Sequence, residues 1–321
     1  MYTSPHLISV RERIRINSEP IGEDLFARYF FEVWDTLEAS ALRKGQDPKE
    51  KPVYFRFLTL LSWHVFLSEA VDVAIYEVGV GGAWDSTNVV EQPDVTGITT
   101  LGIDHVAVLG DTLAQIAWHK AGIFKTGVPA LSVEQAPEGA EVLRERAVER
   151  GVDLRVVGVD PFVSRLEVVP NADYQRRNIS LAIALVVAAG EKLGLTDLRP
   201  DALPDVLKDG IEQTVWRGRC ETKADGPRKW HLDGAHTLDS LKVAAQWFAQ
   251  QTMDSSASRI LIFNQQSRPE AEDLLMCLYE TLSSDCGVQF DHVIFSTNVT
   301  RKDTGYRIGT TREKKARPSV N

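Results

Sequence analysis

The sequence lacks the features that define several common protein classes. Its 321 residues contain no run of about 18 apolar residues, which argues against a membrane-spanning helix. The three cysteines, Cys220, Cys277 and Cys286, are odd in number and lack paired C-x-x-C spacing, so a disulfide framework and a zinc site are both disfavoured. The net charge of −9 argues against a general nucleic-acid binder, although it leaves the local binding of small anions open.

Two common phosphate-binding glycine motifs are also absent from the glycine-rich stretch EVGVGGAWDSTN. Trp84 occupies the third glycine position of G-x-G-x-x-G, and no lysine follows Gly82 as a G-x-x-x-x-G-K-[ST] loop requires. Glycines here let the backbone turn tightly or approach a ligand closely. An oxygen-rich set suited to Mg²⁺ accompanies them, namely Glu77, Asp85, Thr87 and Asn88. An ordinary glycine turn beside a solvated glutamate is an equally weighted alternative.

What is present predicts a soluble α/β protein of about two domains, with 43% hydrophobic and 25% charged residues. Helical spacing covers residues 23–40, 54–70 and 174–194, and β-branched runs predict strands at 72–79, 94–103 and 129–133. This alternation favours a doubly wound, mostly parallel central sheet. After Glu221 the α/β pattern restarts with a short strand in WHLDGAH that runs into a turn, helices at 240–251 and 270–282, and strands at 259–266 and 290–297. We therefore expect domains at 1–217 and 218–321, the second Rossmann-like, with a ligand cleft between them.

Polar side chains follow two of the predicted strands. Glu77 ends the first strand, and Asp104 and His105 end the second. Because the carboxyl ends of parallel strands line one crevice, Glu77 and His105 are expected to face the same ligand. A lone histidine is more often structural, but an imidazole beside a carboxylate is a reasonable ligand pair.

A lysine on the apolar face of a helix is a second candidate. Thr112 and Gln115 have capping-box spacing, and Lys120 falls on the stripe of Ile116 and Phe124. A buried ammonium must find an acid, lose its proton or be modified. Extension of the side chain to solvent is the alternative.

A third candidate set is scattered along the chain, where each member also has an ordinary reading as a cap, a surface charge or a turn residue. Arginines near a domain boundary suit phosphates or carboxylates, which a guanidinium binds through two parallel hydrogen bonds. The set consists of Gln175, Asn178, Arg217, Arg219, Asp233 and His236.

Six motifs in order carry a specific resemblance: YTSPHL, VRERIRIN, EVGVGGAWDSTN, LGIDHVAVLGDTLAQIAWHKAGIFK, WRGRCE and LDGAHT. Together they resemble the folylpolyglutamate synthases of the Mur ligase superfamily, from about Tyr2 to Arg307, with a fungal-like C-terminal half. The resemblance implies a Mur-ligase-like ATP-binding domain followed by a Rossmann-like ligase domain. It implies an ATP-dependent ligase that adds L-glutamate to the γ-carboxylate of tetrahydrofolate and its polyglutamates through an acyl phosphate.

The resemblance also implies roles for individual residues. Ser4, Glu77 and His105 resemble the magnesium ligands, and Lys120 resembles a carbamylated lysine that acts in catalysis beside His105. ATP would be bound by Gln175, Asn178, Arg219, Asp233 and His236, and the folate substrate by Ser4, Pro5, His6 and Arg11. The implied cofactors are ATP and Mg²⁺, with K⁺ as a further candidate. The implied protein is a monomer in the cytoplasm, with the mitochondrion as a second compartment, and has no nucleic-acid partner.

One family motif is missing from the sequence. Relatives carry a G-T-x-G-K-G-[ST] P-loop shortly before the TSPHL motif, whereas this sequence begins at Met1. We therefore expect both domains to be incomplete, the tail 308–321 to be disordered, and the chain as written to have little ligase activity. A truncated gene model, an inactive pterin-binding paralogue and a dihydrofolate synthase-type ligase remain as alternative interpretations.

Overall fold

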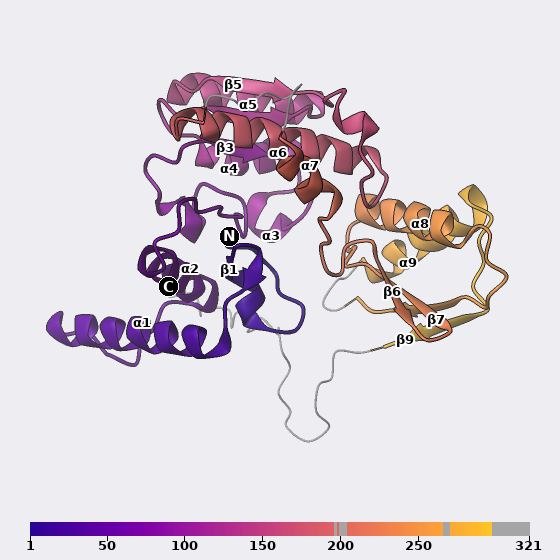
Figure 1. Ribbon diagram of the computed structural model, residues 1–321, viewed down its shortest axis with the longest axis horizontal. Coiled ribbons are helices and arrows are strands. Elements are labelled where there is room, and N and C mark those ends of the chain that lie inside the picture. Colours follow the sequence, from indigo (N-terminus) through magenta and orange to yellow (C-terminus); the bar gives the residue numbers. More distant parts are fainter. Residues whose placement is uncertain (196–197, 199–203, 266–269, 297–321) are drawn as a thin grey trace, which may run out of the picture. The chain divides into compact units, whose positions relative to one another are not determined.

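The computed structural model describes residues 1–195, 198, 204–265 and 270–296 (Figure 1). The chain forms two compact units, Met1–Arg217 and Gly218–Asn321. The tail 308–321, expected to be disordered, lies outside the described residues.

The first unit is built on a parallel sheet of three strands in the order β3, β4, β5. The strands are β3 (Thr96–Ile98), β4 (Ala130–Val133) and β5 (Leu154–Val157). Helices α4 (Leu113–Lys120) and α5 (Pro137–Arg150) share a buried cluster with one face, and α6 (Asp173–Lys192) shares a cluster with the other. The doubly wound α/β arrangement predicted from the sequence is thus confirmed, and Figure 1 shows the helices beside these strands.

Side-chain alternation in β4 explains why both faces of the sheet are covered. Ala130 joins the cluster under α4 and α5, whereas Leu131 and Val133 join the cluster under α6. On β3, a Cβ at Gly97 would lie 2.8 Å from Leu185 of α6, so glycine lets this helix lie close to the strand. The helix predicted at 174–194 is confirmed as α6.

A second core in the same unit lies under two long helices. Tyr2, Ile14 and Leu61 are fully buried there. The helices are α1 (Glu23–Arg43) and α2 (Tyr54–Ser68), which confirm the predictions at 23–40 and 54–70. The remaining elements are η1 (Val10–Arg13), β1 (Arg15–Ile16), β2 (Glu19–Pro20), η2 (Ser86–Val89), α3 (Val106–Leu109), η3 (Ala121–Ile123), η4 (Val163–Arg165) and α7 (Asp205–Glu212).

Two strand predictions in this unit were wrong in extent. The run 72–79 forms no strand among the described residues; it makes a single parallel bridge, between Tyr2 and Tyr76. A β-branched run becomes a strand only where a neighbour supplies ladder hydrogen bonds, and here the neighbour is the short segment after Met1. The strand predicted at 94–103 ends at Ile98, and residues 99–104 are loop.

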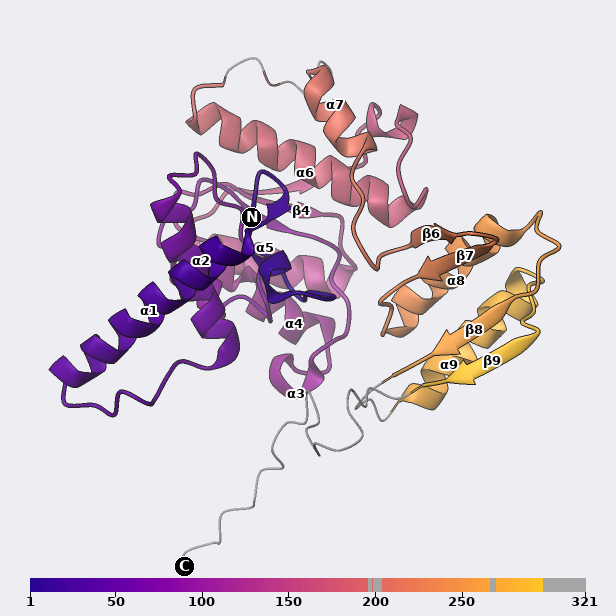
Figure 2. The same ribbon diagram turned by 60° about the horizontal axis from the view of Figure 1, so that its bottom comes forward.

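The second unit begins with an antiparallel hairpin of β6 (Glu221–Asp225) and β7 (Arg228–Leu232). Helix α8 (Leu238–Thr252) follows, and then β8 (Ile260–Phe263) and β9 (His292–Phe295) pair in parallel. In sequence, α9 (Ala271–Glu280) and η6 (Thr281–Asp285) lie between β8 and β9, and Figure 2 shows α9 beside these strands. The opening hairpin was not predicted, because the strand expected near WHLDGAH was placed alone.

Candidate functional site

Glu77 and Ser4 lie together, although they are 73 residues apart in the sequence. The backbone N–H of Ser4 donates to Oε2 of Glu77 at 2.7 Å, and the N–H of Glu77 donates to the carbonyl of Tyr2 at 2.9 Å. Tyr2 is fully buried and anchors this pairing in the core. Two of the three predicted metal ligands are therefore brought to one place by the N-terminal segment.

The carboxylate of Glu12 stabilises the loop after Ser4 by accepting backbone hydrogen bonds from it. Glu12 accepts the N–H groups of Leu7, Ile8 and Ser9, at 2.9, 3.1 and 2.7 Å, and its own segment is the short helix η1. Burial opposes ionisation, but these backbone hydrogen bonds prevail and lower the pKa of Glu12. The hydrogen bonds to Glu12 therefore define the shape of this loop.

The predicted substrate residues in this loop differ in what they contact. Pro5 is exposed and follows Ser4 through a cis peptide bond. His6 accepts a hydrogen bond on Nδ1 from Arg13 Nε at 2.9 Å, and burial together with the Arg13 charge lowers the pKa of His6. Arg11 donates from Nη1 to the carbonyl of Ile21 at 2.9 Å.

The glycines after Glu77 are required by packing against the protein itself. A Cβ at Gly79 would lie 2.4 Å from the ring of Phe55, and one at Gly82 would lie 3.0 Å from the carbonyl of Lys120. Gly81 has a φ of +68°, a conformation that side chains rarely adopt. The turn therefore lies directly against the C-terminal end of α4.

The oxygen-rich set after these glycines stabilises the same turn. Asp85 accepts the N–H of Thr87 at 2.9 Å and the N–H of Val80 at 3.1 Å. Asn88 donates through Nδ2 to the carbonyls of Ala83 and Gly122. These contacts favour a loop-capping role for Asp85, Thr87 and Asn88.

His105 lies in a backbone conformation that histidine seldom adopts. Its φ and ψ are 53° and 35°, and its carbonyl accepts the N–H groups of Val108 and Leu109 in α3. Its N–H donates to Asp104 Oδ1 at 2.8 Å, and Nε2 lies 3.9 Å from Oδ2 of the same carboxylate. His105 is thus placed by a turn seven positions beyond the end of β3, at Ile98, rather than by the strand itself.

Lys120 is the last residue of α4 and is half-buried. Thr112 and Gln115 form the predicted capping box at the other end of this helix, and Ile116 and Phe124 are fully buried. Burial lowers the pKa of Lys120, and the negative charge of Asp104 partly offsets this effect. The structure therefore places Lys120 within electrostatic reach of the residue next to His105.

The predicted ATP residues of the first unit begin α6. Gln175 donates from Nε2 to the carbonyl of Val169 at 3.2 Å, which connects the helix to the preceding loop. Asn178 lies three positions further along the same helix and is half-buried. Both side chains are therefore on the first two turns of α6.

The predicted ATP residues of the second unit form one cluster. Asp233 accepts the N–H of Cys220 at 2.6 Å and that of Ala235 at 2.7 Å, which joins the WRGRCE and LDGAHT motifs. Gly234 allows Arg219 to lie across it, since a Cβ there would lie 2.1 Å from Nη1 of Arg219. His236 Nδ1 is 2.8 Å from the carbonyl of Gly234. Arg219, Asp233 and His236 are therefore adjacent, before the N-terminus of α8.

Two features are absent from the described residues. No group of three or more His, Cys, Asp or Glu side chains there could hold a metal ion. None of the helices in the described ranges is long and apolar enough to cross a bilayer.

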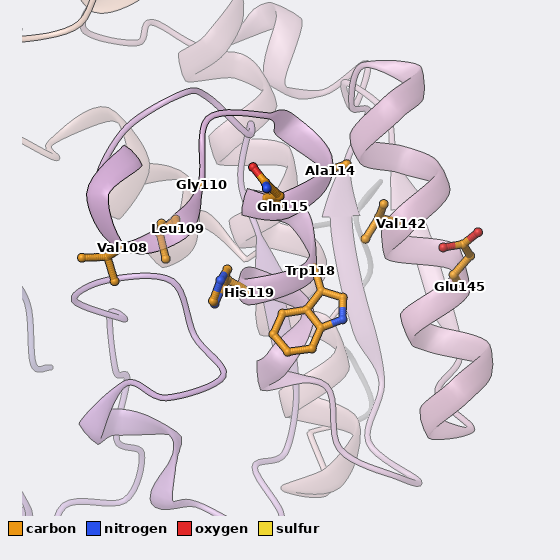
Figure 3. Close-up of a pocket in the computed structure, with 9 residues that line it drawn as sticks. All are labelled: Val108, Leu109, Gly110, Ala114, Gln115, Trp118, His119, Val142 and Glu145. Carbon is orange, nitrogen blue, oxygen red and sulfur yellow. The ribbon is translucent and has the colours of Figure 1, made fainter. Parts of the chain in front are cut away.

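An open pocket of about 450 Å³ is lined by none of the predicted site residues. Its lining includes Trp118 and His119 of α4 and Val142 and Glu145 of α5, which Figure 3 labels. Trp84, which is 74% exposed, has its ring centre 4.8 Å from that of His119. The pocket thus lies along α4 and α5, and Lys120, which ends α4, does not line it.

Sequence reasoning overlooked two residues that organise the site. Gln135 binds the loop before His105: its Oε1 accepts the N–H of Leu101 and its Nε2 donates to the carbonyl of Thr99, both at 2.8 Å. Arg13 contacts His6. A polar residue two positions after a buried strand end was the available signal for Gln135, and the run of alternating arginines was the signal for Arg13.

The fold and these contacts define an α/β protein whose candidate residues lie in loops beyond strand ends and at helix termini, the usual place for ligands in such sheets. No protein-family model matches the chain. The folylpolyglutamate synthase of Neurospora crassa is 56% identical over 314 residues, covering 96% of this chain and 59% of that protein. A probable folylpolyglutamate synthase of Schizosaccharomyces pombe is 48% identical over 309 residues, covering 95% of this chain and 60% of that protein.

Solved structures agree with these relatives. An FPGS–AMPPCP–folate complex matches with a TM-score of 0.74 and 26% identity, covering 92% of this chain and 80% of that one. The chain is therefore homologous to the folylpolyglutamate synthases over nearly its whole length, and the resemblance carried by its motifs is confirmed. This chain spans only 59% and 60% of the lengths of these two curated relatives.

Proposed function

We propose that this chain forms part of an ATP-dependent ligase that adds L-glutamate to the γ-carboxylate of tetrahydrofolate and its polyglutamates. The observation that carries the proposal is the hydrogen bond of 2.7 Å from Ser4 to Glu77, which joins two family motifs into one site. Relatives named folylpolyglutamate synthase support the substrate class. The FPGS complex with AMPPCP and folate supports ATP as the second substrate.

The residues present fit a magnesium ion whose remaining ligands are phosphate oxygens and water. Glu77 and Ser4 carry hard oxygen donors on two segments that the hydrogen bond from the Ser4 backbone joins, and Mg²⁺ usually takes one or two carboxylates together with phosphate oxygens and water. Glu77, Ser4 and His105 would hold the ion, which would supply charge neutralisation on the transferred phosphoryl group.

The remaining site residues would bind and orient the substrates. Arg219 and His236 would contact ATP phosphates or ribose, while Asp233 fixes the two loops that carry them. Gln175 and Asn178 would contact the nucleotide from the start of α6. The acid would be activated as an acyl phosphate and then attacked by the amine of L-glutamate, with phosphate as the leaving group.

Lys120 would be carbamylated in the active protein. Its lowered pKa, caused by burial, favours the neutral amine that reacts with CO₂ to form a carbamate and a proton. Carbamylation replaces a costly buried cation by an anion. A carbamate at this position would add a further oxygen ligand near His105.

The experiment that tests the proposal is a segment exchange. This chain replaces the matching 314-residue segment of the Neurospora crassa relative, and glutamate addition to monoglutamyl tetrahydrofolate is measured. We expect the segment-exchanged protein to release ADP in a glutamate-dependent reaction. The rate should be well above that of the same protein carrying Glu77→Gln, which is the control. A folded exchanged protein without that activity would contradict the proposal, and a preference for dihydropteroate as acceptor would indicate a dihydrofolate synthase instead.

We further propose a monomer that works in the cytoplasm, with the mitochondrion as a second compartment and K⁺ as an additional cation. Gel filtration of the purified chain and localisation of the tagged protein test the first two statements. Stimulation of the exchanged protein by K⁺ over Na⁺ tests the third.

A further inference from the structure

The open pocket of about 450 Å³ along α4 and α5 contains none of the residues assigned to the proposed ligase. Its volume is typical of small-molecule sites in proteins. Apolar side chains line it, among them Val108 of α3, Trp118 of α4 and Val142 of α5, and the one carboxylate among its described lining residues is that of Glu145 (Figure 3). The pocket therefore combines an apolar wall with a negative charge.

Glu145 differs from two other glutamates of α5 in its partners. Glu141 pairs with Arg144, and Glu149 pairs with Arg146. Glu145 has no such partner within the ranges that the structure describes. Residues four positions apart on a helix lie on the same side, so Glu145 and Glu149 are neighbours along α5. The charge of Glu149 is therefore neutralised, whereas that of Glu145, which lines the pocket, is not.

Trp118 already contacts a guanidinium of the protein itself. Cζ of Arg146 lies 4.6 Å from the centre of the Trp118 ring. Arg146 is buried, and its Nε has no hydrogen-bond partner in the described part of the chain. The indole face and the carboxylate of Glu149 therefore stabilise this buried cation together. An indole of α4 and a glutamate of α5 thus hold one guanidinium, and Glu145 offers a second glutamate one turn earlier on α5.

Trp118 also belongs to an aromatic cluster that remains accessible to solvent. Its ring centre lies 5.6 Å from that of Trp84 and 5.2 Å from that of His119, and both tryptophans are exposed. The faces of aromatic rings attract cations. Glu145 would repel an anion such as phosphate, and the net charge of −9 favours the approach of cations. The surroundings of the pocket therefore favour an organic cation.

We propose that this pocket binds a small organic cation, a guanidinium or ammonium group on an apolar body, with Glu145 as its counter-charge and Trp118 as the ring that it contacts. The apolar body would contact Val108 and Val142. A pocket of about 450 Å³ has room for such a body beside the charged group, which favours a small molecule over a lone arginine or lysine side chain of a partner protein. The binding involves no covalent step and does not rest on the proposed function.

The test is titration calorimetry with the purified full chain. The probes are benzoyl-L-arginine amide and benzoyl-L-citrulline amide, which has nearly the same size but a neutral urea group in place of the guanidinium. An exposed ion pair and a cation–π contact together predict that the wild-type chain binds the arginine derivative about 3- to 30-fold more tightly than the citrulline derivative. Raising the salt concentration from about 0.05 to about 0.5 M should reduce this preference, because salt screens the ion pair.

Variants of the two key residues separate binding from folding. Glu145→Gln should bring the two affinities within about threefold, and Glu145→Lys should reverse the preference, because the pocket would then carry a positive charge. Trp118→Leu should weaken binding of the arginine derivative by about threefold or more. Glu141→Gln removes the same charge from α5 at a position that does not line the pocket, and it should leave the preference unchanged. Thermal unfolding of each variant shows whether it is folded.

Three outcomes would overturn the inference. Equal binding of the two probes by the wild-type chain excludes a cation site. An equal preference in the wild-type and Glu145→Gln chains removes the role of Glu145. A pentapeptide of alanines with one central arginine is the third probe, and binding of it about tenfold more tightly than the arginine derivative would indicate a partner protein instead of a small molecule. The ligase proposal is tested separately, in the segment-exchange assay.

Discussion

The two units bury their sheets to different degrees. Every residue of β4 is buried in the first unit, because helices cover both faces, whereas every residue of β9 is exposed in the second. The candidate residues of the second unit are nevertheless fixed, since Asp233 joins the segments around Cys220 and Ala235. In the first unit a packed core positions the site loops, and in the second a local hydrogen-bond network does so.

The largest expected effect lies at the end of α4. Lys120→Ala in the segment-exchanged protein should reduce glutamate addition by about 10²–10³-fold, the usual cost of losing one well-placed electrostatic contact in an active site. A short carboxylic acid should restore part of the rate, because it replaces the missing anion. Steady-state rates with and without acetate measure this.

Lys44→Ala is the matched control for Lys120. Lys44 caps the exposed end of α1, and its loss should leave the rate unchanged. Full activity of Lys120→Ala would remove the carbamate assignment, and failure of acetate to help would favour a collapsed helix end.

The difference in sheet burial predicts unequal costs for one substitution. Val133→Ala on β4 removes two methyl groups from a fully buried side chain and should cost about 2 kcal/mol of unfolding free energy. Val293→Ala on β9, where the side chain is 47% exposed, should cost less than about 0.5 kcal/mol. Urea denaturation of the purified chain measures both, and equal costs would contradict the comparison.

The hydrogen-bond network of the second unit predicts a smaller effect. Asp233→Asn leaves one carbonyl oxygen for the N–H groups of Cys220 and Ala235, so one loses its acceptor at a cost of about 1 kcal/mol. Amide hydrogen exchange at these two residues should accelerate. Asp254→Asn, at an exposed position after α8, is the control, and unchanged exchange in Asp233→Asn would show that the network is dispensable.

The smallest effect concerns pH in the second unit. Burial, together with the charge of Lys229, lowers the pKa of His231 below its usual 6.5, and its ring lies edge-on to Trp247 and Phe248. The unfolded chain therefore binds a proton more readily, so stability is present above about pH 6.5 and is lost as the pH falls through the folded pKa.

His231→Gln should remove this dependence. The difference between wild-type and variant unfolding free energies should change by less than about 1 kcal/mol from neutral pH to about pH 5. Thermal unfolding across that range checks the prediction. Parallel pH profiles would mean that His231 stays solvated.

Local patterns predicted much of the fold. Spacing alone predicted α1, α2 and α6, and it predicted the capping box of Thr112 and Gln115, because helix periodicity and capping depend on residues within one or two turns. The strand at 72–79 was wrong for the converse reason. Strand formation depends on a neighbour, and composition does not show whether one is present.

The candidate site likewise has features that the sequence predicts and features that depend on the folded chain. The sequence by itself determined the residue types: a carboxylate at Glu77, glycines after it, a lysine on an apolar stripe and three arginines in VRERIRIN. Only the tertiary structure decided that Ser4 donates to Glu77, that Gly82 packs against the end of α4, and that Arg13 donates to His6 whereas Arg11 donates to a backbone carbonyl. Hydrogen bonds between segments 73 residues apart depend on where a folded core brings the chain back on itself, and no local pattern encodes that return.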